Sequence, residues 1–290
     1  MKILWFGVFD GIEYRSEYPM VRGIEKCGGQ VIQCNYRGET YTSIEDAVTQ
    51  EHDIVFIQNG AGFKPDWMEI LTKPVVYFAS EFSFSRAKHI VNAARKPDYV
   101  ICHSEQVLEK VKKKNIACCR LDHAYNPEHY YTISNVLFEY DFCFVGSLFT
   151  RRKRIFKYLS KKLPASTHIV TRAHPEKANL LYNSSRIVLH IHALHQNYIP
   201  IRLFEVLPTN GMLLIEEMGT NWDPRIGDQV CIQWKDKKEL VEKIQYYLQS
   251  ERERSRIVHN ANIAAGNHTW DERMKQFYKV MEHVQQSTGA

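Results

Sequence analysis

Four consecutive cations are the residues whose type and spacing most clearly suggest chemistry. They occupy positions 151–154 and follow an apolar stretch that ends in a Gly-Ser pair. Apolar residues at helical spacing continue beyond them, so the cations fill the first turn of a predicted helix. Positive side chains there oppose the helix dipole, whereas the free N–H groups of a helix start attract phosphate. A solvated helix face is the alternative, but the pattern favours a diphosphate site made of Gly146, Ser147, Arg151, Arg152 and Lys153.

A second group of charges lies inside an apolar helix. Residues 201–207 have an apolar side that Arg202 and Glu205 interrupt, and a turn follows before the apolar run at 212–215. A charge in such a place is costly unless it is paired or faces a polar ligand. The two side chains could form an ion pair at i,i+3. Alternatively, Glu205 accepts hydrogen bonds from ligand hydroxyls while Arg202 contacts negative charge.

The elements that must position these residues are alternating strands and helices. Apolar runs that predict strands in the first half lie at residues 2–9, 30–34, 53–58, 74–79, 99–102 and 116–121. Helical patterns separate them, which predicts βαβ units and a parallel sheet. The second half repeats the pattern, with strands expected at residues 142–145, 168–172, 187–194 and 212–215. A chain of 290 residues therefore suits two α/β domains of about 140 residues each.

Ligands of such sheets bind beyond the carboxyl ends of the strands, so the residues at those ends are candidates for catalysis. In the first half these residues include Asp10, Glu81, His103 and His123. A carboxylate or an imidazole in this position could act as the general base that removes a proton from an acceptor hydroxyl. The candidates for catalysis are Glu81, His103 and Asp10. A histidine at a strand end is also commonly a structural residue.

Three histidines, His190, His192 and His195, suggest a metal site and hence a metal hydrolase. No carboxylate lies near them in the sequence, and their spacing is not that of H-E-x-x-H, so no essential metal is expected. The chain also lacks the spaced glycines of a dinucleotide site and the G-x-x-x-x-G-K-[ST] loop. These absences argue against a dehydrogenase and a P-loop enzyme.

The composition is that of an ordinary soluble protein in which charge is unevenly placed. The chain is 44% hydrophobic and 24% charged, with a net charge of +5 and no apolar run long enough to span a membrane. Residues 151–177 hold nine Lys or Arg against one acid, and residues 86–122 hold nine against four. These blocks suit an anionic ligand, although solvated helix faces would look the same. Seven cysteines without a C-x-x-C pair favour a reducing cytoplasm.

The order R-x-F-E, a turn with glycine and an apolar strand ending in Glu resembles the donor-site signature of GT-B glycosyltransferases. The chain is most similar to the CgeB-like (spore-maturation protein) group, which also has F-V-G-S…R-R and a C-terminal H-T-aromatic segment, matched here at residues 144–152 and 268–270. In related retaining enzymes a Glu-x7-Glu pair flanks this helix, and its second Glu binds ribose. Glu205 matches that second Glu, whereas Asn197 replaces the first. The end of the strand at 187–194 brings Tyr198 into the donor cleft, and the architecture implied by the resemblance assigns Arg172 to the nucleotide base.

This resemblance implies the GT-B fold, in which two Rossmann-like domains with parallel sheets face each other across a cleft. The expected domains are residues 1–135 for the acceptor, 136–270 for the nucleotide sugar, and a C-terminal helix at 271–290 that packs back on the first domain. It also implies the transfer of a hexose or pentose from a nucleotide-diphosphate donor, such as a UDP-sugar, to an acceptor hydroxyl without a metal. The acceptor, a saccharide, a protein or a nucleic acid, is open, and so is the anomeric outcome, with a slight preference for retention. The alternatives are glucosylation of a DNA base, as in viral enzymes, and a degenerate protein that binds nucleotide sugars without catalysis.

Overall fold

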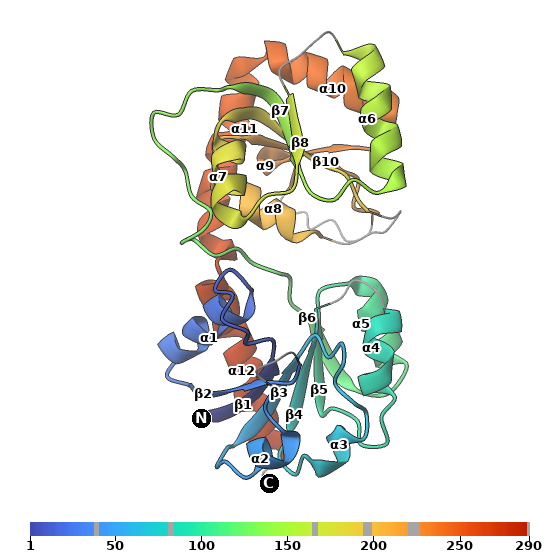
Figure 1. Ribbon diagram of the computed structural model, residues 1–290, viewed down its shortest axis with the longest axis vertical. Helices are drawn as coiled ribbons and strands as arrows, with labels where there is room; N and C mark the ends of the chain where they lie inside the picture. The colour runs from blue at the N-terminus through green and yellow to red at the C-terminus, as the bar shows by residue number, and fades with distance from the viewer. Residues whose placement is uncertain (38–40, 81–83, 164–167, 194–198, 220–226, 289–290) are drawn as a thin grey trace. The chain divides into compact units, whose positions relative to one another are not determined.

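The computed structural model describes residues 1–37, 41–80, 84–163, 168–193, 199–219 and 227–288. The chain forms two compact units (Figure 1). Unit 1 consists of Met1–His123 together with Trp270–Ala290, and unit 2 consists of Ala124–Thr269. Each unit is a parallel sheet covered by helices, so the predicted α/β fold class with two Rossmann-like sheets is confirmed.

Six strands of unit 1 form one sheet in the order β2-β1-β3-β4-β5-β6, and every neighbouring pair is parallel. Their central members are buried on both faces, as continuous apolar runs require. The strands are β1 (Lys2–Gly7), β2 (Gln30–Asn35), β3 (Ile54–Gln58), β4 (Val75–Ala79), β5 (Tyr99–Cys102) and β6 (Ala117–Arg120).

Helices cover both faces of this sheet. They are α1 (Glu17–Lys26), α2 (Ile44–Val48), α3 (Trp67–Ile70), α4 (Phe84–Val91), α5 (Glu105–Lys112) and the C-terminal α12 (Trp270–Thr288). Helices α1 and α12 lie side by side (Figure 1), and Phe277 of α12 packs edge-on against Phe56 and Phe78 of the sheet. The C-terminal helix is therefore part of the core of unit 1.

The sheet of unit 2 has the order β11-β10-β9-β7-β8 and is also parallel throughout. Its strands are β7 (Tyr140–Val145), β8 (His168–Thr171), β9 (Ser185–His190), β10 (Met212–Glu216) and β11 (Ile232–Trp234). Its helices are α6 (Thr150–Lys162), α7 (Pro175–Asn183), α8 (Ile201–Val206), α9 (Gly227–Val230), α10 (Lys237–Gln249) and α11 (Glu251–Ala265), followed by the 3-10 turn η2 (Gly266–His268).

The two faces of this sheet carry different helices because successive side chains of a strand point to opposite sides. Phe142 and Phe144 of β7 pack with α6 and α10, whereas Cys143 and Val145 pack with α7 and α8. We call these the α6 face and the α8 face.

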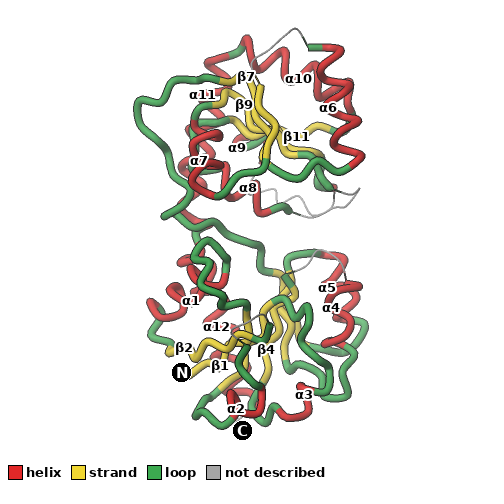
Figure 2. The backbone as a smooth tube through the Cα atoms, viewed as in Figure 1, coloured by secondary structure: helices red, strands yellow, loops and turns green. Residues whose placement is uncertain are grey.

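The connecting segment 124–139 belongs to unit 2, although the predicted boundary followed residue 135. Figure 2 shows it as a loop. Its backbone is bound to unit 2: the N–H of Tyr131 donates to Asn179 Oδ1 at 3.2 Å, and the N–H of Ile133 donates to Asn183 Oδ1 at 3.0 Å. Tyr125 also forms a parallel bridge with Thr269. These side-chain acceptors are not readable from the segment itself, which explains the difference.

Most elements lie within a few residues of their predicted bounds, but α7 was not predicted. Pro175 at its start and Glu176 in its first turn are typical helix-start residues, and they were the available signal. No helix in the described part of the chain has the length and apolar character needed to cross a bilayer.

Candidate functional site

The carboxyl edge of the unit 2 sheet at β7 and β9 is the candidate functional site. Strand β7 pairs with β8 on one side and with β9 on the other, so the chain runs from β7 to β8 in one direction and then returns past β7 to β9 in the other. Loops after parallel strands leave from the same edge, and ligands of doubly wound sheets bind where the strand order reverses. The loop after β7 holds Gly146 and Ser147 and leads into the arginines of α6, so the structure places these predicted residues at the reversal.

Gly146 lies where a side chain would be tightly packed at this edge. A Cβ atom at this position would lie 3.1 Å from the Phe144 ring and 3.5 Å from Arg152 Nη1. The Gly146 N–H donates to the Thr171 carbonyl at 2.7 Å. The sequence analysis expected this N–H to face a donor phosphate, whereas the structure uses it to join the loop after β7 to the end of β8.

Arg152 is turned into the protein. Its side chain is buried, with Nε and Nη2 donating to the Ile191 carbonyl at 2.9 and 2.6 Å and Nη1 donating to the Ser147 carbonyl at 2.8 Å. The guanidinium also lies 5.0 Å from the centre of the Phe144 ring, in cation–π geometry. Arg152 therefore ties the loops after β7 and β9 together, a structural task that the diphosphate hypothesis did not include.

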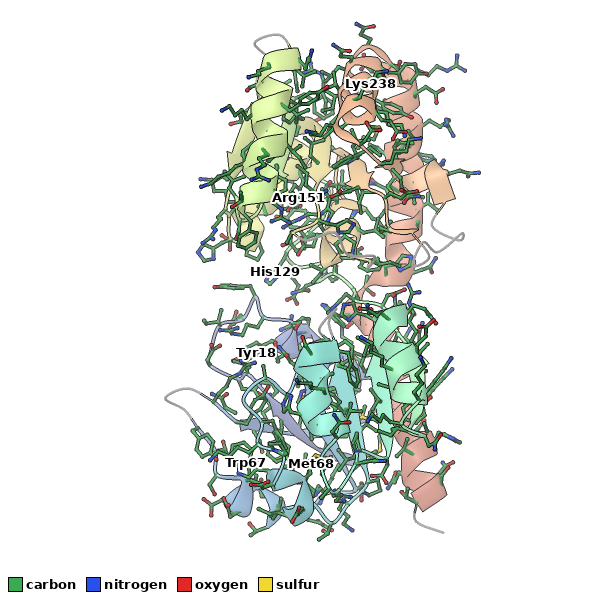
Figure 3. All side chains as sticks on the ribbon, turned by 90° about the vertical axis from the view of Figure 1, so that its right-hand side faces the viewer. Tyr18, Trp67, Met68, His129, Arg151 and Lys238 are labelled. Atoms are coloured by element: carbon green, nitrogen blue, oxygen red, sulfur yellow. The ribbon has the colours of Figure 1, made fainter. Side chains whose placement is uncertain are left out.

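Arg151 is held at the same edge by Glu216, the last residue of β10. Nη1 of Arg151 donates to Glu216 Oε2 at 2.9 Å and to the His192 carbonyl at 2.9 Å, and Nη2 donates to Glu216 Oε1. The same carboxylate accepts the His192 N–H at 2.8 Å. Bidentate pairing of this kind fixes the orientation of a guanidinium. Figure 3 labels Arg151 among the side chains of this unit.

The remaining cations of this edge face outward. Lys153 and Arg172, which follow β7 and β8 respectively, are both exposed. The N-cap residue of α6 is Phe149, whose side chain makes no capping hydrogen bond. The first turn of the helix contains no acid. The start of α6 therefore carries positive side chains and no acid in its first turn, a combination that attracts an anion.

Arg202 and Glu205 form the ion pair that the sequence analysis considered as an alternative. Nη1 of Arg202 donates to Glu205 Oε2 at 2.7 Å, and both side chains are largely buried. The Arg202 guanidinium lies 5.3 Å from the centre of the Tyr182 ring. Burial, together with the charge of Glu205, raises the pKa of Tyr130. These contacts place the pair in an aromatic environment on the α8 face.

The two charged groups are thus associated with opposite faces of one sheet. Arg152 packs on Phe144 of the α6 face, whereas Arg202 lies over Tyr182, a member of the α8-face core. A ligand that contacts both groups must therefore reach across the carboxyl edge. Asn197 and Tyr198, which were predicted to join them there, lie outside the described residues.

His190, the last residue of β9, and His192, just after that strand, form a buried pair. His190 Nε2 lies 3.4 Å from His192 Nδ1, and burial lowers the pKa of both side chains. His195 lies outside the described residues. Within the described ranges, no three His, Cys, Asp or Glu side chains gather in a way that could hold a metal ion.

In unit 1, Asp10 is engaged by a neighbouring cation. Arg15 Nε donates to Asp10 Oδ1 at 2.8 Å and Nη2 donates to Oδ2 at 2.7 Å. These hydrogen bonds lower the pKa of Asp10, which makes its carboxylate a weaker base. Glu81, the other carboxylate candidate for catalysis, lies outside the described residues.

His103 and His123 lie together at the carboxyl edge of the unit 1 sheet. Their ring centres are 4.5 Å apart, and His123 also contacts Phe78 and Trp270. Burial lowers the pKa of His103 well below its usual value and that of His123 to about 4. Both rings are therefore neutral near pH 7, the form in which an imidazole can accept a proton.

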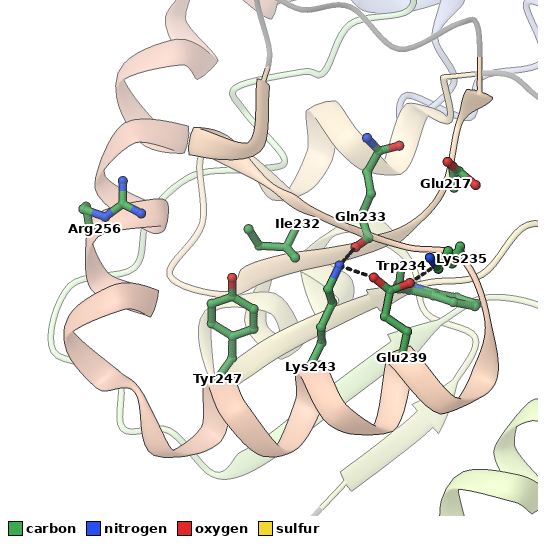
Figure 4. Close-up of a pocket in the computed structure, with 9 residues that line it drawn as sticks. All are labelled: Glu217, Ile232, Gln233, Trp234, Lys235, Glu239, Lys243, Tyr247 and Arg256. Carbon is green, nitrogen blue, oxygen red and sulfur yellow. Dashed lines mark hydrogen bonds and ion pairs between the residues drawn. The ribbon is translucent and has the colours of Figure 1, made fainter.

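A pocket of about 460 Å³ lies beside β11 and does not include any predicted donor residue. Figure 4 shows that two of its charged side chains, Lys243 and Glu239, interact with each other. Lys243 donates to the Gln233 carbonyl and pairs with Glu239 at 2.8 Å, and the N–H of Lys235 donates to Glu239 Oε2 at 2.8 Å. Because the pocket contains no predicted donor residue, and its Lys243 and Glu239 pair with each other, we do not assign the site to it.

The sequence analysis did not identify Glu216 as a member of the site. It lies at the end of the apolar strand that the analysis expected, and this position was the available signal because the carboxyl end of a strand meets the ligand edge. Its partner could not be identified from spacing, since 65 positions separate it from Arg151.

A known protein family matches the part of the chain that contains this site. The model of the family described as "Glycosyl transferase-like" matches residues 132–279. It covers just over half of the chain, including every strand of unit 2. The match names this broad family and not the CgeB-like group that the motifs resemble. No protein of curated function matches the chain by sequence.

Several solved structures are similar over nearly the whole chain. Anabaena HepE in complex with UDP and glucose has a TM-score of 0.72 at 11% identity, covering 98% of this chain and all of that one. Sucrose-phosphate synthase from Thermosynechococcus elongatus has a TM-score of 0.75 at 9% identity, covering 99% and 100%. WaaG, a glycosyltransferase involved in lipopolysaccharide biosynthesis, has a TM-score of 0.65 at 12% identity, covering 96% and 99%. At such identities the similarity shows the fold alone, which is the GT-B fold of two Rossmann-like domains.

Proposed function

Because the chain belongs to the Glycosyl transferase-like family, we propose that it transfers a sugar from a UDP-sugar to an acceptor hydroxyl. The observation that carries this proposal is the family match over residues 132–279, which includes the reversal edge of unit 2 and both of its charged groups. The choice of uridine is supported by HepE, a protein of the same fold that is described with UDP and with glucose.

The cations of the carboxyl edge would stabilise the diphosphate as it leaves. The exposed Lys153 and the uncapped start of α6 supply positive charge there, and Arg151 is fixed in place by Glu216. Oriented donors of this kind stabilise developing negative charge without reorganisation during the reaction. The proposed chemistry therefore requires no metal ion. Arg172, exposed after β8, would contact the nucleotide base.

Glu205 would accept hydrogen bonds from the ribose hydroxyls. Its ion pair with Arg202 keeps the carboxylate charged inside a largely buried environment, and a charged acceptor makes stronger hydrogen bonds than a neutral one. The position of this residue favours retention of the anomeric configuration and membership of the CgeB-like group.

The acceptor would bind to unit 1, where His103 and Asp10 remain candidates for proton transfer with Glu81. Of these, His103 has the neutral, buried imidazole that a base requires, although its low pKa limits its strength. All seven cysteines are free thiols, which supports a cytoplasmic reaction.

Calorimetric titration with UDP, ADP, GDP and CDP tests the donor assignment. We expect UDP to bind most tightly of the four. At 100 times its Kd, bound UDP should stabilise the fold by about 2.7 kcal/mol and so raise the melting temperature. Glu205→Gln should weaken UDP binding about tenfold or more by removing a charged acceptor, whereas the exposed Glu217→Gln should not. Failure of all four nucleotides to bind would refute the proposal. Binding of UDP without transfer or hydrolysis of any UDP-sugar would instead indicate a non-catalytic protein.

A further inference from the structure

A pocket of about 240 Å³ lies at the amino edge of the unit 2 sheet, opposite to the edge that holds the candidate donor site. Arg186, the second residue of β9, and Asn210, in the turn before β10, line it together with one face of α11. At ~3.3 Å per residue, Arg186 lies about 13 Å along β9 from His190, which ends that strand at the carboxyl edge. A ligand of this pocket would therefore be separate from the donor.

Arg254 of α11 is the buried cation of this pocket. The residue is only 6% exposed, and it lines the pocket. Its Nη1 donates to the carbonyls of Tyr247 and Leu248 in the last turn of α10, to the second of them at 3.0 Å. Nε and Nη2 have no acceptor among the residues that the structure describes. Neither of these two nitrogens is fully enclosed, so each keeps surface that a ligand can reach.

Arg186 brings a second guanidinium to the same pocket. Its Nη1 donates to Asp141 Oδ1 at 3.3 Å, and the guanidinium lies 5.7 Å from the centre of the Phe138 ring. Within the described part of the chain its Nε and Nη2 also have no acceptor. Burial lowers the pKa of Arg254, and the charge of Arg186 lowers it further, so the two cations are close enough to repel each other. An anion that binds both would relieve this repulsion.

The acids near these arginines leave the donors unfilled. Asp141 engages a single nitrogen of Arg186. Glu251, the first residue of α11, lines the pocket, is exposed, and has no hydrogen bond or ion pair within the described ranges. Both carboxylates act on Arg254 through their charge, so the pocket as a whole is not strongly cationic. A singly charged ligand suits this balance better than a phosphate, because the two acids would repel a second negative charge.

We propose that this pocket binds the carboxylate group of a small molecule that also carries an apolar part. Nε and Nη2 of Arg254 would donate to the two carboxylate oxygens, because the planar fork of a guanidinium matches a carboxylate, and Arg186 would donate to the same group. Phe138 and Val258, which also line the pocket, would contact the apolar part. The ligand is either an amino acid, with its ammonium group beside Glu251, or an acid without an amine. This inference does not depend on the proposed transferase activity.

Calorimetric titration of the full chain with 3-phenylpropionate tests the proposal. We expect this acid to bind about tenfold or more tightly than 3-phenylpropanamide, which has nearly the same shape without the charge. Arg186→Gln should weaken binding of the acid about tenfold, because a charged donor is lost. The matched control is Arg256→Gln, which removes an exposed charge from α11 outside the lining and should bind within about twofold of the unmodified chain.

Two further arms test the fork of Arg254 and the kind of acid. Arg254→Lys keeps the charge but loses the planar fork, so it should bind 3-phenylpropionate about tenfold more weakly, whereas Arg256→Lys should not. If Arg254→Lys does not fold, Arg186→Gln carries the test alone. L-Phenylalanine has the same skeleton with an added ammonium group. Tighter binding of L-phenylalanine that is lost in Glu251→Gln would identify an amino acid as the ligand, and tighter binding of 3-phenylpropionate would identify an acid without an amine.

Three results would overturn the proposal. They are the absence of binding of both acids at about 10 mM, equal binding of 3-phenylpropionate and its amide, and equal weakening in Arg186→Gln and Arg256→Gln. Saturating UDP should leave binding of the acid unchanged, because the two sites lie at opposite edges of the sheet, and complete displacement by UDP would also refute a separate site. Failure of UDP to bind would count against the transferase proposal and would leave the carboxylate result standing.

Discussion

Replacing Arg152 should lower the stability of unit 2 far more than replacing its neighbour Lys153, although both were predicted to bind diphosphate. In Arg152→Ala the carbonyls of Ile191 and Ser147 lose their donors. In Lys153→Ala an exposed side chain is lost. The two changes remove the same formal charge from adjacent positions, so a difference between them measures the structural role of Arg152.

The contacts set the size of the effect. Ile191 has no exposed surface, so water cannot replace the donor to its carbonyl, and an unsatisfied buried acceptor costs about 1–3 kcal/mol. Loss of the cation–π contact with Phe144 adds about 0.5–2 kcal/mol. The Ser147 carbonyl is half-buried and can turn to water. We therefore expect Arg152→Ala to lower the free energy of unfolding by about 1.5–5 kcal/mol, against about 0.5 kcal/mol or less for Lys153→Ala.

Scanning calorimetry of the full chain provides the measurement. For a unit of this size each kcal/mol lowers the melting temperature by about 2–4 °C, so Arg152→Ala should melt about 5–15 °C lower than the unmodified chain. Arg152→Lys keeps the charge but loses the planar fork that reaches both carbonyls, so it should be nearly as unstable. Equal melting temperatures for Arg152→Ala and Lys153→Ala would refute the structural role, and wild-type stability of Arg152→Lys would show that charge alone is required.

Three further changes test other contacts. Glu216→Gln should lower the stability of unit 2 by about 1.5–3 kcal/mol, because Arg151 loses its charged acceptor, and denaturant unfolding measures this loss. Gly211→Ala should cost about 1–3 kcal/mol in the same assay, since its Cβ would lie 2.5 Å from the Tyr182 carbonyl oxygen. Lowering the pH should destabilise unit 1: burial holds the pKa of His123 at about 4 in the fold, so the unfolded chain binds more protons between about pH 6.5 and pH 4, and up to about 3 kcal/mol of stability is lost over that range.

Each of these changes has a matched control. Glu217→Gln alters the adjacent, exposed carboxylate and should be neutral. Gly266→Ala meets no atom within 4 Å at a helical backbone conformation, so it should be neutral or slightly stabilising. For the pH dependence, His123→Gln should make the curve less steep, with His103 supplying the remaining slope, while the exposed His283→Gln should leave the curve unchanged. A curve that His123→Gln does not change, or a destabilising Gly266→Ala, would contradict the corresponding argument.

The sheets were predictable because their physical cause is local. An apolar run such as Val75–Ala79 must be buried on both faces, and parallel strands covered by helices are the arrangement that achieves this. The regular alternation of such runs with helical patterns determined the fold class, and the resemblance of the motifs pointed to the GT-B family. Helix α7 was missed because its apolar periodicity is weak, although Pro175 marked its start.

Side-chain roles were less predictable because they depend on partners far away in the sequence. Four adjacent cations look equivalent in the sequence, yet Arg152 points to carbonyls at Ser147 and Ile191 whereas Lys153 is exposed. Helical geometry separates neighbouring side chains by about 100°, so the cations of one turn cannot all face one ligand. Which of them face inward depends on the carbonyls that the ends of β7 and β9 present.

The same reasoning applies to Gly211, which the sequence placed in the turn before the apolar run at 212–215. There is no room for a side chain at this position. A Cβ atom on Gly211 would lie 2.5 Å from the Tyr182 carbonyl oxygen and 3.2 Å from the Ser185 carbonyl oxygen. This close approach packs the turn before β10 against α7 and β9. Glu216, at the other end of β10, holds Arg151. The strand that carries the acceptor of Arg151 thus begins next to a glycine whose place depends on backbone far away in the sequence, a connection that single-residue motifs do not contain.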